Sequence, residues 1–449
     1  MNTAAATARR RRVLAAAFVA AFALSQALLW YAYYGAGAKA LIGDELTYQQ
    51  TALSILAGGA WMPGTIWPPL QPLLLAAVYA LCGVHVLAAQ LLQTLLFIAC
   101  GALLRDLWRR LGGSVAAANT AAALFLLDPG IAAYAHWLWP EIPHLFLLLG
   151  ALALLLRARA FAAGLCVGLA LLAKSLLSPF WPVLAWLLVR GERPLAGLRP
   201  VVIFLLGIGL VTAPALLHGW REYGKPMIAD SSIYNLWVGL NDHWRSDYVE
   251  DMGGRTLPGF LASADTPQAR NAIYLAKVRA LVAERGVVDV AMAQLGRQYF
   301  RLFSAKTPLV SQLPGPACAG HLSVYTSSPV LTRVLTWAND AFHALILATA
   351  AFGIAAWRRR PDRLLLVLAL FAGYQLALFA LIHVKARFLL PLLPFLCGFA
   401  GSFLVTLRRR GDDEATTMTP LRLGIGAALA AVLLFLAFAG PALDRLCAG

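Results

Sequence analysis

Acidic residues are scarce in this sequence, with 21 Asp and Glu against 37 Lys and Arg among 449 residues. Charged residues of both signs make up 13% of the chain and hydrophobic residues 60%. Soluble domains carry about 25% charged residues. This composition therefore excludes a protein built around one soluble core and indicates that lipid solvates most of the chain. Six scattered cysteines form no CxxC pair, so the sequence indicates neither a disulfide framework nor a zinc site.

The motifs of soluble nucleotide enzymes are also missing. We find no Walker loop, no G-x-G-x-x-G fingerprint and no nucleophile triad, so any donor arrives already activated from the membrane. No cofactor and no metal ion is predicted. The net charge of +16 does not require a nucleic-acid partner, because the basic residues stand in short clusters between apolar runs of about 20 residues.

These runs predict an all-α polytopic membrane protein with about eleven transmembrane helices, at 13–34, 86–107, 115–135, 141–157, 160–176, 177–190, 200–218, 337–357, 363–382, 388–407 and 421–440. The first run is longer than the core of a signal peptide and lacks a convincing cleavage site. We therefore expect it to be an uncleaved membrane helix.

The arginine clusters predict the orientation in a bacterial inner membrane. Placing them on the cytoplasmic side works only if the apolar run 70–81 lies along the outer surface instead of crossing. The N-terminus is then cytoplasmic, and the larger outer segment contains helices near 267–285 and 287–304. The predicted division is a catalytic transmembrane module at 1–218 with an outer loop at 35–88, a periplasmic domain at 219–336 and a C-terminal four-helix module at 337–449.

Two adjacent carboxylates, Asp44 and Glu45, follow the first membrane helix. A base held at a membrane boundary suits deprotonation of an acceptor hydroxyl. The structural alternative is that Asp44 caps a short helix and Glu45 favours its dipole. Glu141, in Trp-Leu-Trp-Pro-Glu, is a third candidate acid at the start of a helix, a position that the helix dipole also favours. His136 and His144 flank it with a spacing too irregular to predict a metal site.

Three cations stand on the predicted outer side, where the orientation rule does not favour them: Lys174, Lys385 and Arg387. Phosphate is the obvious anion for them to hold. The alternative is that they extend to lipid headgroups. Tyr48 and Trp67 are candidate substrate contacts, although the prolines after Trp67 are sufficiently explained by a rigid turn.

Taken in order, several motifs resemble the GT-C class of integral-membrane glycosyltransferases, and most of all family 39, which includes protein O-mannosyltransferases and lipid A aminoarabinose transferases. The resemblance covers residue 13 to about 400 and rests on Gly43 to Tyr48, Trp67 to Leu70, Trp139 to Glu141, Gly164 to Lys174, Tyr223 to Pro226 with Asn235 to Trp237, and Arg387 to Pro394.

The resemblance implies a seven-helix module with two surface helices in the first outer loop, and a polyprenyl-phosphate-linked sugar as donor. It places the catalytic base on Asp44, a second acid on Glu141, and positions near the donor phosphate on Lys174 and Arg387. One departure is Trp67, where relatives often carry His or Lys. The acceptor is left open among a lipid, a glycan and a protein.

Two other functions compete with this interpretation. A lipid-linked sugar flippase or transporter predicts charges at several helix midpoints and broken helices in paired halves. An O-antigen polymerase or ligase predicts reliance on outer arginines instead of an Asp-Glu pair. The sequence concentrates its acids at one predicted face and leaves the helix middles nearly free of charge, which favours the transferase.

Overall fold

A computed structural model describes residues 3–35, 37–41, 43–62, 66–189, 194–240, 257–297, 299–305, 328–358, 362–409 and 419–444. Within these ranges the chain is helical and has no β-strand. The longer helices are α1 (Thr3–Tyr34), α2 (Asp44–Leu56), α3 (Leu70–Cys82), α4 (Val86–Arg110), α5 (Val115–Leu127), α7 (Glu141–Leu156), α8 (Ala160–Ala173), α10 (Pro194–Tyr223), α11 (Ser232–Leu240), α13 (Pro267–Arg285), α14 (Val287–Arg297), α15 (Pro329–Ala356), α16 (Arg363–Phe379), α17 (Leu393–Arg409) and α18 (Pro420–Asp444). Shorter elements are α6 (Pro129–Ala133), α9 (Trp181–Trp186), α12 (Leu257–Leu261) and the 3-10 turns η1 (Tyr134–His136), η2 (Ser175–Leu177), η5 (Tyr299–Leu302) and η6 (Ala386–Leu389).

The chain is a multi-pass membrane protein. Five described helices are long and apolar enough to cross a bilayer, namely α1 from Arg12, α4, α10 from Leu198, α15 and α18. Other apolar helices are shorter: α8 has 14 residues and reaches about 21 Å, against a hydrocarbon core of about 30 Å. The predicted eleven crossings and their orientation therefore stay predictions.

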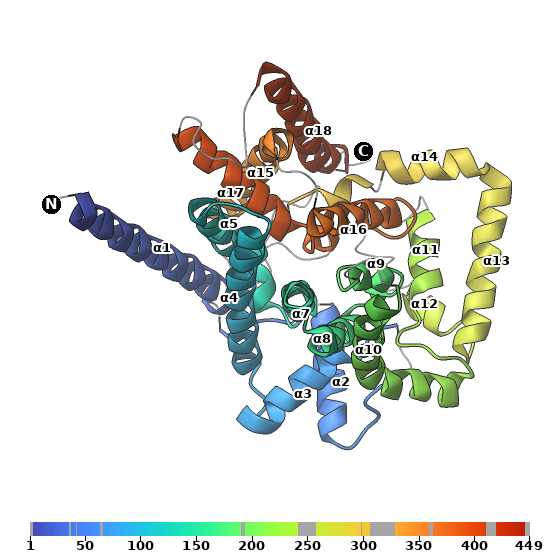
Figure 1. Ribbon diagram of the computed structural model, residues 1–449. Helices are drawn as coiled ribbons and strands as arrows, with labels where there is room; N and C mark the ends of the chain where they lie inside the picture. Colours follow the sequence, from blue (N-terminus) through green and yellow to red (C-terminus); the bar gives the residue numbers. More distant parts are fainter. Residues whose placement is uncertain are drawn as a thin grey trace.

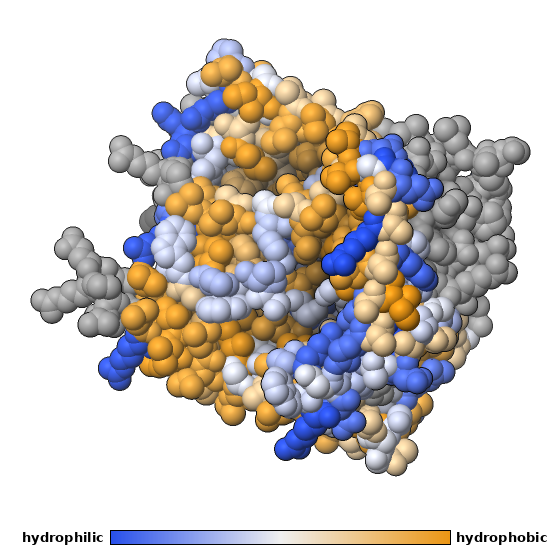
Figure 2. All heavy atoms as spheres, turned by 90° about the vertical axis from the view of Figure 1, so that its right-hand side faces the viewer, coloured by the Kyte–Doolittle hydropathy of each residue, from blue (hydrophilic) through white to orange (hydrophobic). Residues whose placement is uncertain are grey.

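Large apolar side chains stand exposed on the candidate spans. Leu206 and Leu210 of α10 are 61% and 64% exposed, and Trp337 of α15 and Leu421 of α18 are each 74% exposed. Figure 2 shows wide hydrophobic areas with hydrophilic residues gathered in bands between them. Water does not tolerate apolar patches of this extent, whereas lipid does.

Helices α7 and α8 lie at the centre of the molecule, between α4 and α10 (Figure 1). Helix α8 packs closely on α10 because glycines remove side chains from the contact. A Cβ at Gly168 would lie 3.0 Å from the Ile208 carbonyl oxygen, and one at Gly164 would clash with the Phe204 carbonyl. Small residues four apart are typical of closely packed membrane helices. This contact holds the end of α8, where Lys174 lies.

Two predicted continuous helices are interrupted. The run 115–135 breaks at Asp128, which accepts a hydrogen bond from the Ile131 backbone N–H and caps α6, so that the two parts are bent by 55°. In the described part of the run 177–190, the one α-helix is the six-residue α9, and the turn η2 ends where the run begins, at Leu177. Pro129 causes the first break and Pro179 and Pro182 the second, because proline lacks a backbone donor and disfavours helix before it.

The predicted helix near 267–285 is confirmed as α13, whereas the one predicted near 287–304 is only partly confirmed, because α14 ends at Arg297 and the 3-10 turn η5 covers Tyr299–Leu302. Helix α15 begins at Pro329, earlier than the predicted start at 337. Ser328 caps it by accepting a hydrogen bond from the Leu331 backbone N–H, and proline follows at the first helical position. This combination is a strong helix-start signal. The predicted boundary at residue 336 therefore falls inside a helix.

Candidate active site

Helix α2 presents Asp44 as its first residue. The residue before it, Gly43, takes the cap position with a φ of 57°, a conformation that glycine adopts without strain. No side chain forms a capping hydrogen bond there, so the interpretation of Asp44 as a helix cap is wrong. Its carboxylate instead accepts a hydrogen bond from Arg387, at 2.8 Å, across 343 residues of sequence.

Arg387 joins two acids. Its Nη2 is 2.8 Å from Asp44 Oδ2 and its Nε is 3.5 Å from Glu141 Oε1. The Nζ of Lys174 lies 2.8 Å from the same Glu141 oxygen. Helices α2, α7 and α8 and the turn η6 thus bring predicted site residues into one group. With Lys385, which interacts electrostatically with all four, they form what we call the charge cluster.

The members of the charge cluster differ in exposure. The Asp44 side chain is 24% exposed, Arg387 13% and Lys174 15%, whereas Glu141 is 1% exposed. Burial alone would raise the pKa of Asp44, but the positive charges of Arg387 and Lys385 outweigh it and hold that pKa below its usual value. Asp44 is therefore ionised and also the more accessible of the two acids.

Lys385 is set apart by its titration. Burial, and then the charge of Arg387, lowers the pKa of Lys385 to about 7. Arg387 and Lys174 match the charges of Asp44 and Glu141, so Lys385 adds a positive charge to the cluster only when it is protonated. The Oε2 atom of Glu141 accepts no hydrogen bond from the described residues.

Aromatic rings surround the charges. The guanidinium of Arg387 lies 4.7 Å from the centre of the Trp139 ring, and Lys174 Nζ lies 5.5 Å from that of Phe388. Both are cation–π distances. Tyr48 lies one turn after Asp44 and is buried; burial, and then the charges of Asp44 and Glu141, raises its pKa well above the usual value. Its hydroxyl therefore stays protonated beside the cluster.

Helix α11 packs against the segment that carries the cations. The backbone N–H of His383 donates to the Asn235 carbonyl at 2.9 Å, and a Cβ at Gly239 would clash with Ile382. Tyr234 of α11 is buried, and burial and then the charge of Asp44 raise its pKa. Trp67 is half-buried and packs against the apolar cluster that contains Tyr234 and Phe260.

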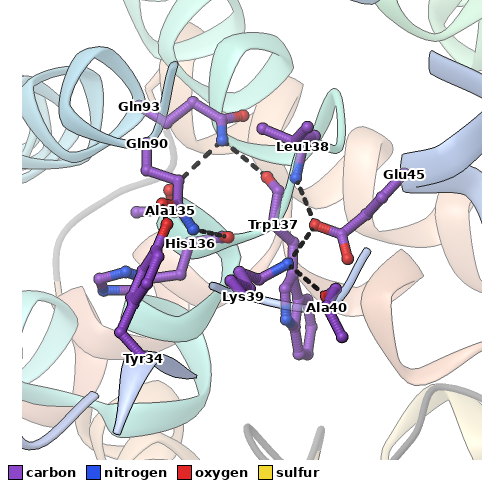
Figure 3. Close-up of polar contacts among 10 residues, drawn as sticks. All are labelled: Tyr34, Lys39, Ala40, Glu45, Gln90, Gln93, Ala135, His136, Trp137 and Leu138. Carbon is purple, nitrogen blue, oxygen red and sulfur yellow. Dashed lines mark hydrogen bonds and ion pairs between the residues drawn. The ribbon is translucent and has the colours of Figure 1, made fainter. Parts of the chain in front are cut away.

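Glu45 has different contacts from Asp44. Its side chain is fully buried, and its Oε1 lies 2.6 Å from Lys39 Nζ and 2.9 Å from the backbone nitrogen of Leu138 (Figure 3). Lys39 was not among the predicted site residues. Trp139, Phe388 and Tyr234, which lie close to the charge cluster, were not among them either. The only signal for Lys39 was a cation near the acid pair, which does not distinguish a buried partner from a surface charge.

No three His, Cys, Asp or Glu side chains among the described residues are placed to hold a metal ion. His136 Nε2 lies 3.2 Å from Gln26 Oε1, and the His136 ring makes a T-shaped contact with the Trp30 ring. His144 is buried in α7.

No protein-family model matches the chain, and no curated protein matches it in sequence. ArnT from Cupriavidus metallidurans in the apo state shares 17% identity over 87% of this chain and 78% of its own, with a TM-score of 0.39. The structure of ArnT from the same organism bound to undecaprenyl phosphate shares 17% identity over 86% and 77%, with a TM-score of 0.36. Neither overlap is close enough to assign a fold or an activity.

Proposed function

We propose that the protein is a membrane glycosyltransferase that moves a sugar from a polyprenyl-phosphate carrier to an acceptor on the periplasmic face of the bacterial inner membrane. The observation that carries the proposal is the charge cluster. Segments up to 343 residues apart contribute the ionised carboxylate of Asp44, the cations Arg387 and Lys174, and Lys385, which is positive below about pH 7, to one site with aromatic walls. A base next to a phosphate-binding group is what this transfer needs.

Asp44 is the proposed base. It takes the proton of an acceptor hydroxyl while the acceptor oxygen bonds to the anomeric carbon of the donor sugar. The bond from that carbon to the phosphate oxygen breaks, and the electron pair leaves with the phosphate. A direct displacement of this kind inverts the anomeric centre. Polyprenyl phosphate is a good leaving group, so no general acid is required.

Arg387, Lys174 and Lys385 are the proposed phosphate ligands. Arg387 bridges Asp44 and Glu141, and its planar fork also suits two phosphate oxygens. Bound phosphate would compete for this guanidinium and draw positive charge away from Asp44. The pKa of Asp44, held low by that charge, would then rise and make Asp44 a better base once the donor is in place.

The competing functions fit less well. A hydrolase normally places two carboxylates on either side of the bond, one of them a protonated acid. Here Glu141 is almost inaccessible and paired with Lys174. A transporter is favoured by the single bent pair of helices at Asp128, but transporter breaks come in paired halves. The described helices contain no second such pair.

The test is glycolipid profiling of a deletion strain complemented with variants. The wild-type gene should restore one missing sugar, which identifies the acceptor as well. Asp44→Asn should lower transfer by roughly 100- to 10,000-fold, because Asn cannot accept the proton. Asp106→Asn is the control, since Asp106 also pairs with arginines, Arg110 and Arg157, but outside the cluster. Wild-type transfer by correctly inserted Asp44→Asn protein would rule out Asp44, and Glu141 would be tested next.

A further inference from the structure

Lys39 and Glu45 form an ion pair that is closed to solvent. The Lys39 Nζ and Glu45 Oε1 atoms are 2.6 Å apart, and both side chains are 0% exposed. Lys39 also lies 5.8 Å from the centre of the Tyr33 ring, at the end of α1. The pair therefore joins the chain leaving α1 to the first turn of α2. A fully buried carboxylate cannot meet an acceptor, so Glu45 needs an explanation other than base catalysis.

Glu45 reaches across to the segment 135–138. Its Oε1 accepts a hydrogen bond from the backbone N–H of Leu138 at 2.9 Å. In Figure 3 this segment lies between Glu45 on one side and two glutamines of α4 on the other. Glu45 is thus the support that the segment receives from α2.

The glutamines hold the carbonyl groups of the same segment. The amide of Gln93 donates to the carbonyls of Trp137 at 2.6 Å and Ala135 at 3.3 Å, and that of Gln90 donates to His136 at 2.6 Å. Tyr34 in turn donates its hydroxyl to Gln90. Backbone from 135 to 138 is therefore bonded on both sides by buried side chains, which fixes its position more firmly than an ordinary loop.

The segment leads directly into the charge cluster. Trp139, the next residue, lies under the Arg387 guanidinium, and Glu141 binds Lys174. Asp44, in the same helical turn as Glu45, binds Arg387. The Glu45–Leu138 hydrogen bond thus closes a ring of contacts that runs through Asp44, Arg387 and Trp139.

We infer that Glu45, held by Lys39, is a positioning residue that sets the place of Asp44 relative to the phosphate-binding cations through its hydrogen bond to Leu138. This inference rests on the proposed function and assigns Glu45 a role distinct from catalysis. The essential part of Glu45 is the oxygen that accepts the hydrogen bond from the Leu138 N–H. Lys39 neutralises and orients that carboxylate.

Two double variants separate the hydrogen bond from the charges. Lys39→Met with Glu45→Gln removes both charges but keeps an oxygen for Leu138. Lys39→Met with Glu45→Leu removes the charges and the oxygen. Both variants remove the two charges together and leave no unpaired buried charge, which is the strongly destabilising case, so both proteins should fold. Melting temperature in detergent checks this before any activity is compared.

We expect the Gln variant to keep kcat within about threefold of wild type. The Leu variant should lose roughly 10- to 100-fold in kcat at a nearly unchanged donor KM, because small misplacements of reacting groups carry penalties of this size. Wild-type kcat in the folded Leu variant would overturn the inference. Equal losses of kcat in both variants would also overturn it, because the charges of Lys39 and Glu45 would then matter instead of the hydrogen bond to Leu138.

Hydrogen exchange measures the link without any turnover. The peptide covering 135–141 should exchange faster in the Leu variant than in the Gln variant, which should resemble the wild type. Absence of sugar transfer by the wild-type protein would count against the proposed function. The exchange rates of the two variants would still test whether Glu45 holds the segment 135–138. Equal exchange in the two variants would show that Glu45 does not hold the segment.

Discussion

At the scale of single residues, neighbours in the sequence have separate roles. Successive residues of a helix point about 100° apart, so Asp44 and Glu45 face different directions. Asp44 contacts Arg387 and is partly open to solvent, whereas Glu45 is buried against Lys39. The sequence predicted the acid pair and its place near the membrane boundary. Which of the two acids contacts the cations depends on the rotation of α2 about its own axis, and the packing of α2 against its neighbours sets that rotation.

Lys385 gives the site a pH dependence. Burial and then Arg387 lower its pKa to about 7, and the charges of Asp44, Glu141 and Lys174 also act on it. A lysine with a lowered pKa is positive below that value and loses its charge as the pH rises through it. Donor KM should therefore increase above about pH 7, provided that Lys385 binds the phosphate.

The measurement is donor KM across about pH 6 to about pH 9 for the wild type and for Lys385→Arg. Arginine stays charged throughout this range, so the variant should have a flat profile above neutrality. A wild-type rise that persists unchanged in Lys385→Arg would assign the effect to another group.

At the scale of elements, the sequence predicted the positions of most helices but not their interruptions. Apolar runs locate helices because lipid forces backbone groups to bond within the segment. Pro179 and Pro182 carried a signal against a continuous helix at 177–190, and Ser328 with Pro329 carried one for the early start of α15. Hydrophobicity alone hides both signals, because proline and serine occur within otherwise apolar stretches.

The contact between α8 and α10 yields a stability prediction. In Gly164→Ala the new methyl group would meet the Phe204 carbonyl, a backbone atom that cannot move aside cheaply. We expect a loss of about 1–3 kcal/mol in unfolding free energy, measured as a lower melting temperature in detergent, and reduced transfer because α8 ends at Lys174. Gly209→Ala on α10 is the matched control, since no atom lies within 4 Å of its Cβ position. Equal melting of the two variants would contradict this account of the packing.

At the scale of the whole molecule, orientation is the prediction on which the active face depends. A reporter fused after Arg110 should be cytoplasmic, because basic residues are retained on that side. One inserted at Gly286, in the turn between α13 and α14, should be periplasmic. A cytoplasmic signal from Gly286 would place the large segment on the wrong side and overturn the periplasmic active site.

The sequence by itself determined that this chain is a helical membrane protein. Both properties follow from local features, namely apolar runs, few charged residues and backbone hydrogen bonds that form within each helix. It also indicated which acids and cations were unusual for their positions. Only the tertiary structure decided that Asp44 pairs with Arg387 across 343 residues and that Glu45 pairs with Lys39. Those pairings depend on how α2, α7 and α8 pack, and packing is a property of several helices at once, which no single stretch of sequence contains.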